Sequence, residues 1–100
     1  MAAYFVWHNR IRNADRMQEY LSKVFETLAP YHYEVVVFDE HSHVVEGNAP
    51  GPRTIVLKFD SRDTAMAWYN CLAYKEVCPL RLAATEGFGV LVDEYVAPGT

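Results

Sequence analysis

The chain has 100 residues, of which 51% are hydrophobic and 22% charged, a balance typical of one globular domain. We therefore expect a single domain over residues 1–100 that buries its core without disulfide or metal staples. A formal net charge of -4 leaves no basic field to attract phosphates, which disfavours nucleic acid and anionic membranes as partners. The first residues carry no cationic region before an apolar stretch, so we expect a cytoplasmic protein without a membrane span.

The two cysteines, Cys71 and Cys78, are not expected to form a disulfide. In a continuous helix their spacing corresponds to about 10.5 Å of rise, whereas the Cα atoms of a disulfide lie within about 7 Å. Pro79 can kink such a helix, so the geometric objection is strong without being absolute. Their spacing is not that of a CxxC redox motif, and reduced thiols in a reducing compartment are expected.

The first half of the chain predicts a strand, a helix and a second strand. Residues 4–9 are β-branched and aromatic, which favours a strand. Asn13 is placed to cap a helix that Pro30 ends, and residues 33–39 predict the second strand. Apolar residues in the helix recur at helical spacing and predict one buried stripe: Met17, Tyr20, Leu21, Val24 and Leu28.

The second half predicts a polar arm, a strand, a helix and a last strand. Glycine and proline concentrate in residues 41–53, before a third strand over residues 54–59. Ser61 is placed to cap a helix, and Pro79 is expected to open a further short helical piece. Gly87 and Gly89 lead into a last strand ending at residue 96. One face of the helix is expected to carry Ala65, Trp68, Tyr69 and Leu72.

The resulting order, βαββαβ, predicts an α+β ferredoxin-like fold with a four-stranded antiparallel sheet and two helices on one face. The strands do not alternate apolar and polar residues: Phe5 and Trp7 oppose Val6, and Val35 and Val37 oppose Val36 and Phe38. A sheet that is apolar on both sides needs a second cover. Another copy of the chain is the simplest one, so we expect a homodimer of the dimeric α+β barrel type. The alternative is a monomer whose long side chains fold over that face.

Several short motifs run from the arm to the end of the second helix: Glu46-Gly47, Pro52-Arg53, Phe59-Asp60-Ser61, Ala65, Trp68-Tyr69, Tyr74 and Arg81. This pattern resembles that of DUF1330, a family of small bacterial domains of unknown function. With Asn13-Ala14-Asp15 and Tyr20 in the first helix, the resemblance covers nearly the whole chain. It implies a ferredoxin-like dimer, but no reaction. The chain departs from the family pattern at His32-Tyr33, where Gly-Gly is usual, and at Cys71-Leu72, where Ser-Pro is common.

Aromatic residues and two arginines are the candidates for ligand binding. A cavity beside the sheet could hold a small organic molecule against Trp7 and three further aromatic residues, Trp68, Tyr69 and Tyr74. Arg53 or Arg81 could bind a carboxylate or an enolate, because a guanidinium group presents paired donors. The opposing interpretation is that the aromatic residues pack the core and that the arginines tie helix ends or loops together.

Histidines are the candidates for proton transfer, because imidazole titrates near neutral pH. His32 precedes the second strand, and His8 lies in the first. His41 and His43 would lie on one side of an extended segment, but the polar arm that holds them is expected to face water. We expect no metal and no cofactor.

Two functions remain open at this level. One is a dimeric module that binds a small aromatic or carboxylate-bearing ligand without catalysis. The alternative is a cofactor-independent enzyme, monooxygenase-like or isomerase-like, that acts on an enolisable or aromatic molecule with a histidine as base. A purely structural dimer would need no enclosed polar pocket. The sequence does not decide whether the protein is an enzyme.

Overall fold

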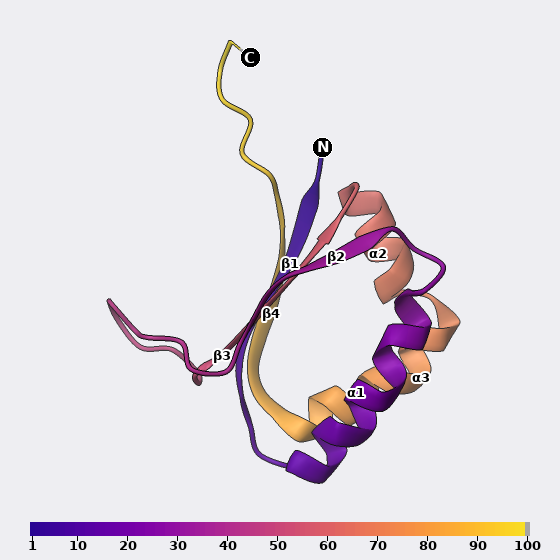
Figure 1. Cartoon of the computed structure of the whole chain (residues 1–100), viewed down its shortest axis with the longest axis vertical. Helices are drawn as coiled ribbons and strands as arrows, with labels where there is room; N and C mark the ends of the chain where they lie inside the picture. The colour runs from indigo at the N-terminus through magenta and orange to yellow at the C-terminus, as the bar shows by residue number, and fades with distance from the viewer. Residues whose placement is uncertain (100) are drawn as a thin grey trace.

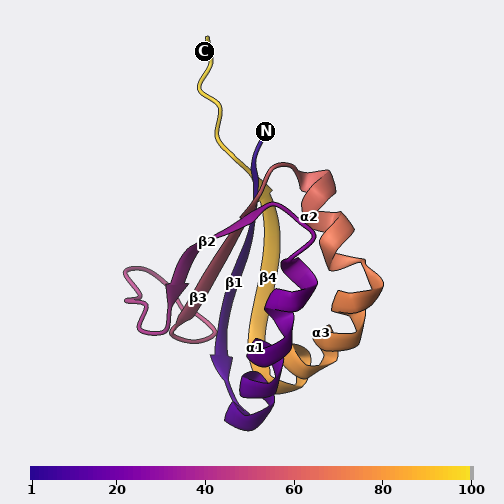
Figure 2. The same cartoon turned by 45° about the vertical axis from the view of Figure 1, so that its right-hand side comes forward.

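The computed structural model describes residues 1–99. Four strands form one antiparallel sheet in the order β2-β3-β1-β4, and the helices lie on one side of it (Figures 1 and 2). The sheet and its helices therefore agree with the predicted α+β architecture. The elements in chain order are β1 (Ala3–Ile11), α1 (Ala14–Leu28), β2 (Tyr33–Asp39), β3 (Arg53–Phe59), α2 (Arg62–Tyr69), α3 (Leu72–Ala84) and β4 (Thr85–Asp93).

Capping side chains determine where each helix begins. The side chains of Asn13 and Ser61 each accept the backbone N–H three residues ahead, at 3.1 Å, as predicted. The Cys71 thiol does the same at 3.4 Å and starts a third helix. The prediction that Pro79 opens the later helical piece is therefore wrong, because Pro79 lies inside α3. The break also removes Leu72 from the face of α2, and 76% of Leu72 is exposed.

The last strand begins earlier than predicted. β4 starts at Thr85, directly after α3, and Gly87 and Gly89 lie inside it rather than before it. Gly89 pairs with Trp7 of β1. A Cβ atom at position 89 would lie 2.4 Å from the Trp7 Cδ1 atom, so only glycine lets the indole lie against this strand. Glycine weakened the strand signal in the sequence, although the packing requires it.

Residues of β1 alternate between the two faces of the sheet, whereas a bulge interrupts the alternation in β2. Phe5 and Trp7 lie on one face, as predicted, and the structure shows that this face is buried against the helices. In β2 the register shifts at Val36, so that Val35 pairs with Leu57 and Phe38 pairs with Ile55. Val35 and Phe38 therefore both face the helices, which corrects the strict alternation predicted for this strand.

One apolar cluster forms the core and takes side chains from β1, β3 and all three helices. Trp68 and Tyr74 are fully buried in it. The Trp68 indole N–H donates to the Thr27 hydroxyl at 3.0 Å, and its ring stacks on Phe59 with centroids 5.6 Å apart. Both cysteines are free thiols. No helix within residues 1–99 is long and apolar enough to cross a bilayer.

The side of the sheet away from the helices is uncovered by any other element in residues 1–99 (Figures 1 and 2). We call it the open face. Its residues on the edge strand β4 are 41–52% exposed although they are large and apolar: Phe88, Val90 and Val92. They pair across the strands with Tyr4, Val6 and His8 of β1. The predicted two-sided apolarity of the sheet is therefore present in the structure.

Candidate functional site

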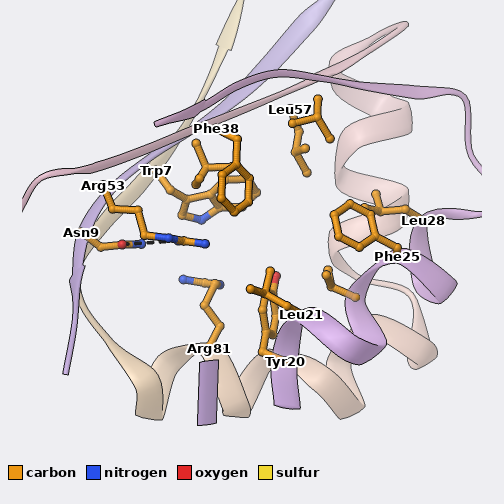
Figure 3. Close-up of a pocket in the computed structure, with 13 residues that line it drawn as sticks. Trp7, Asn9, Tyr20, Leu21, Phe25, Leu28, Phe38, Arg53, Leu57 and Arg81 are labelled. Atoms are coloured by element: carbon orange, nitrogen blue, oxygen red, sulfur yellow. Dashed lines mark hydrogen bonds between the residues drawn. The ribbon is translucent and has the colours of Figure 1, made fainter. Parts of the chain in front are cut away.

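A narrow cavity of about 40 Å³ lies between α1, α3 and the strands β1 to β3. Arg53 and Arg81 point into it from opposite sides, one from the sheet and one from a helix (Figure 3). We call it the arginine cavity. Asn9 and Tyr20 line it beside the arginines, whereas Phe25, Leu28 and Leu57 form its apolar far end (Figure 3). Val24 and Val35 also line the cavity.

Arg53 is the first residue of β3 and is only 6% exposed. Its Nη1 atom donates to Asn9 Oδ1 at 3.5 Å, and its buried Nε atom has no acceptor within residues 1–99. The guanidinium carbon lies 5.2 Å from the centroid of the Phe38 ring. Burial lowers the pKa of Arg53, although Glu40 acts in the opposite direction. Arg53 is thus a buried cation whose hydrogen-bonding capacity is largely unused.

Arg81 enters the cavity from the C-terminal half of α3. Its Nε atom donates to the Tyr74 hydroxyl at 3.3 Å, and its Nη2 atom contacts Cys78 Sγ at 3.6 Å. The guanidinium carbon lies 5.7 Å from the centroid of Trp7. The Thr85 hydroxyl donates to the Arg81 carbonyl at 2.9 Å and holds the end of the helix. The side chain is therefore held in place while part of its guanidinium edge stays available.

The phenols next to Arg81 do not neutralise it. The hydroxyls of Tyr20 and Tyr74 are 2.9 Å apart and share a hydrogen bond. Burial raises the pKa of both phenols above the ordinary value of 10.0, so both are uncharged at neutral pH. Neither Arg53 nor Arg81 forms an ion pair with a carboxylate in the described part of the chain. Two cations thus face one cavity, and no carboxylate is among the residues within 1–99 that line it.

A second cavity, of about 350 Å³, lies on the same side of the sheet, next to β4. Trp7 and Arg81 line both cavities and separate them. Tyr69 contributes to the second cavity only. The remaining side chains around it are mostly apolar and include Phe5, Met66 and Leu82.

The structure places the predicted ligand-binding residues in four different roles. Arg53 and Arg81 come together in the arginine cavity, and Tyr69 lines the second cavity. Trp68 lines neither cavity and packs in the core. Tyr74 also lines neither, but its hydroxyl holds Arg81. The core interpretation of the aromatic residues therefore describes Trp68 best.

The two candidate proton carriers lie outside both cavities. The side chain of His32 is 85% exposed, with its Nδ1 atom 2.9 Å from Asp60 Oδ1. His8 lies on the open face, where its Nδ1 atom is 3.2 Å from the Thr54 hydroxyl. No group of three or more histidine, cysteine, aspartate or glutamate side chains that could hold a metal ion occurs within residues 1–99.

Sequence reasoning did not identify Asn9, Tyr20 and Phe38 as members of the site. Asn9 carried a usable signal, because it follows Phe5 and Trp7 at the period of the buried face although it is polar. Tyr20 was assigned to the apolar stripe of its helix and to the family resemblance, but not to a cavity. Phe38 could not be placed, because the bulge at Val36 changes the face on which it lies.

Comparison with known protein families finds a match to the family described as "Domain of unknown function (DUF1330)", over residues 2–95. A comparison with curated proteins gives no match. The family found from the motifs is therefore confirmed by a match over most of the chain.

Solved structures with the same fold include proteins of known and of unknown function. A protein of unknown function from Rhodopseudomonas palustris, RPA0582, superposes with a TM-score of 0.79 at 13% identity, over 96% of this chain and 84% of that one. SnoaB, a cofactor-independent oxygenase from Streptomyces nogalater, gives 0.63 at 7% identity, over 99% and 98%. HapK from Hahella chejuensis gives 0.61 at 18% identity, over 98% and 97%. At these identities the likeness extends to the fold alone.

Proposed function

Because the chain belongs to the family of domains of unknown function DUF1330, which carries no assigned reaction, we propose a function from the site itself: the protein binds a small organic anion. The anionic group, a carboxylate or an enolate, lies between Arg53 and Arg81 in the arginine cavity. The observation that carries this proposal is the pair of guanidinium groups that face one cavity with no carboxylate partner in residues 1–99.

The energetics of burial support a ligand as the missing partner. A buried charge is costly to desolvate unless an opposite charge and hydrogen bonds compensate it. Arg53 is buried and has one long hydrogen bond, to Asn9. The cost of desolvating its charge is therefore not offset by strong hydrogen bonds in the folded protein. A carboxylate between the two guanidinium groups would accept several charge-assisted hydrogen bonds, which are among the stronger ones in proteins. The neutral phenols of Tyr20 and Tyr74 would not compete with it.

Binding of 3-phenylpropanoate, measured by calorimetry, tests the proposal. The alcohol 3-phenylpropanol has the same apolar body without the charge and serves as the matched control ligand. We expect the acid to bind wild-type protein and the alcohol to bind about tenfold more weakly or worse, which corresponds to about 1.4 kcal/mol. A panel of small carboxylates of which none binds in the millimolar range would overturn the proposal.

Single substitutions of the arginines locate the binding site. Arg53→Gln and Arg81→Gln keep a polar side chain but remove the charge, and each should weaken 3-phenylpropanoate at least about tenfold. Arg62→Gln is the control, because Arg62 is exposed and pairs with Asp93 on the surface. Equal affinities in all three variants would show that the anion binds elsewhere.

The alternative, a cofactor-independent enzyme, has one observation in its favour. Two guanidinium groups could stabilise a developing enolate as well as a carboxylate. Proton abstraction also needs a base within hydrogen-bond reach of the substrate. The residues that line the arginine cavity in the described chain include no histidine, carboxylate or lysine, and His8 and His32 lie elsewhere. The site therefore supports binding better than it supports catalysis.

We also propose that the open face associates with the same face of a second copy. The observation in favour is the row of exposed apolar residues on β4, namely Phe88, Val90 and Val92, with no helix over them. A symmetric pair would bury each row against its equivalent, which is how an isologous interface removes apolar surface from water. Light scattering of the purified protein measures the assembly directly, and a mass of 11.5 kDa at high concentration would contradict it.

A further inference from the structure

We infer that the second cavity binds the apolar body of the same ligand, so that the ligand is an aryl-substituted carboxylate rather than a simple small acid. This inference rests on the proposed function, because it assumes that the carboxylate lies at Arg81. The ligand would then occupy a second subsite in addition to the arginine cavity, and its chemical class would be that of the aryl-substituted carboxylates. Two observations support this inference: the cavities differ in volume, and they share Trp7 and Arg81.

The two volumes indicate where each part of a ligand can lie. The arginine cavity has about 40 Å³, which exceeds the roughly 10–15 Å³ needed to hold a water molecule and suits a carboxylate group. Cavities that hold whole organic ligands have roughly 300–1,000 Å³. Only the second cavity, with about 350 Å³, reaches that size. The body of a ligand is therefore expected in the second cavity and its charged end in the first.

Arg81 and Trp7 connect the two subsites. Both residues line both cavities, and the guanidinium carbon of Arg81 lies 5.7 Å from the Trp7 ring centroid. A carboxylate that binds Arg81 therefore starts at the boundary between the cavities. The substituent of the carboxylate can then extend along the Trp7 ring into the second cavity. Because the substituent is uncharged, it needs no second cation there.

β4 borders the second cavity through three consecutive residues, Gly87, Phe88 and Gly89. Gly87 and Gly89 are the helix-facing residues of β4 at this level, and both line the cavity. Gly89 lies against the Trp7 indole so closely that a Cβ atom would be 2.4 Å from Cδ1. Two glycines at alternate positions weaken a strand, yet Gly89 lets the Trp7 ring, which lines both cavities, lie directly on β4. The second cavity beside this ring is also lined by the aromatic residues Phe5 and Tyr69.

The walls of this cavity favour an aromatic ring over an extended alkyl chain. Phe5 and Trp7 are stacked with centroids 5.0 Å apart, and Tyr69 lies 5.5 Å from Phe5. Offset contacts between aromatic rings stabilise beyond the area they bury. Leu82, at 60% exposure, and Met66, at 36%, leave apolar surface at the rim that a bound ring would cover.

Intermolecular NOEs between unlabelled 3-phenylpropanoate and methyl-labelled protein show which cavity holds the ring. We expect NOEs from the phenyl protons to the methyl groups of Met66 and Leu82, which line only the second cavity. NOEs to the methyl groups of Val24 and Leu28, which line only the arginine cavity, would overturn the inference. That second result would leave the proposed function intact, because the acid would still be bound.

Affinity measurements on a filled cavity provide an independent test. Leu82→Trp narrows the second cavity, and Leu72→Trp makes the same change at an exposed leucine of α3 that lines neither cavity. We expect Leu82→Trp to weaken 3-phenylpropanoate at least tenfold and to change propanoate less than twofold, while Leu72→Trp changes neither. An unchanged affinity for 3-phenylpropanoate in Leu82→Trp, or an equal loss for both acids, would overturn the inference. Failure of both acids to bind wild-type protein would instead overturn the proposed function.

Discussion

The two faces of the sheet use the same strands for different purposes. On the helix side, Phe5 and Trp7 of β1 pack into an aromatic core. Two cavities lie beside this core, and Arg81 lines both of them. On the open face, Val6 and His8 of the same strand lie beside apolar residues that nothing in residues 1–99 covers. Successive side chains of β1 point to opposite faces of the sheet. One set therefore lies at the ligand site, and the other lies at the proposed interface. Substitutions on one face should therefore leave the property of the other face unchanged.

The largest expected effect is on the core of the helix side. Trp68→Ala removes a fully buried ring and its hydrogen bond to Thr27, and should lower the free energy of unfolding by about 3–5 kcal/mol. Urea denaturation measures this. Leu72→Ala, at an exposed position, should change it by less than about 0.5 kcal/mol. A small loss in Trp68→Ala would mean that the aromatic cluster does not hold the helices on the sheet.

The next effect separates the two faces. Val90→Asp places a charge on the open face, where it would be buried without a partner if two copies associate. We expect the dimer dissociation constant to rise at least about tenfold, or about 1.4 kcal/mol, with no change in affinity for 3-phenylpropanoate. Val45→Asp, at a valine that is 84% exposed in the connection between β2 and β3, is the control. Light scattering that shows the same mass for both variants would argue against this interface.

The smallest expected effect concerns the hydroxyl that holds Arg81. Burial raises the pKa of Tyr74, so above about pH 10 the unfolded chain loses this proton while the folded chain keeps it. The free energy of unfolding must then fall as the pH rises beyond that value. Tyr74→Phe should make this alkaline decline less steep and should cost about 1 kcal/mol at neutral pH. The exposed Tyr95→Phe should do neither. An unchanged decline in Tyr74→Phe would show that Tyr74 is not the phenol responsible.

Much of the fold could be predicted because local signals and packing agree there. The apolar spacing in α1 and the capping residues Asn13 and Ser61 gave those helices their correct places. The start of α3 could not be predicted, because a cysteine is an unusual cap. The start of β4 could not be predicted either, because Gly87 and Gly89 resemble a turn and their reason lies in the packing of Trp7.

The candidate site was predicted in its charges but not in its shape. Arg53 and Arg81 were identified from their residue type and from the family motifs, and the structure brings them to one cavity. The number of residues between Arg53 and Arg81 in the sequence does not show that their side chains line the same cavity. The position of Phe38 depends on a bulge, and the division into two cavities depends on Trp7 and Arg81 together. Such features arise from tertiary packing, which local periodicity does not encode.

The central claim is that Arg53 is retained for a ligand and not for stability. Its most direct test is the free energy of unfolding of Arg53→Met, measured with and without 3-phenylpropanoate. Because this variant replaces a buried unpaired charge by an apolar side chain, we expect it to be as stable as wild type or more stable by about 1 kcal/mol without the acid. We also expect no stabilisation of the variant by the acid, in contrast to wild type. A loss of about 3 kcal/mol or more without the acid, as for a side chain that the fold requires, would contradict the account.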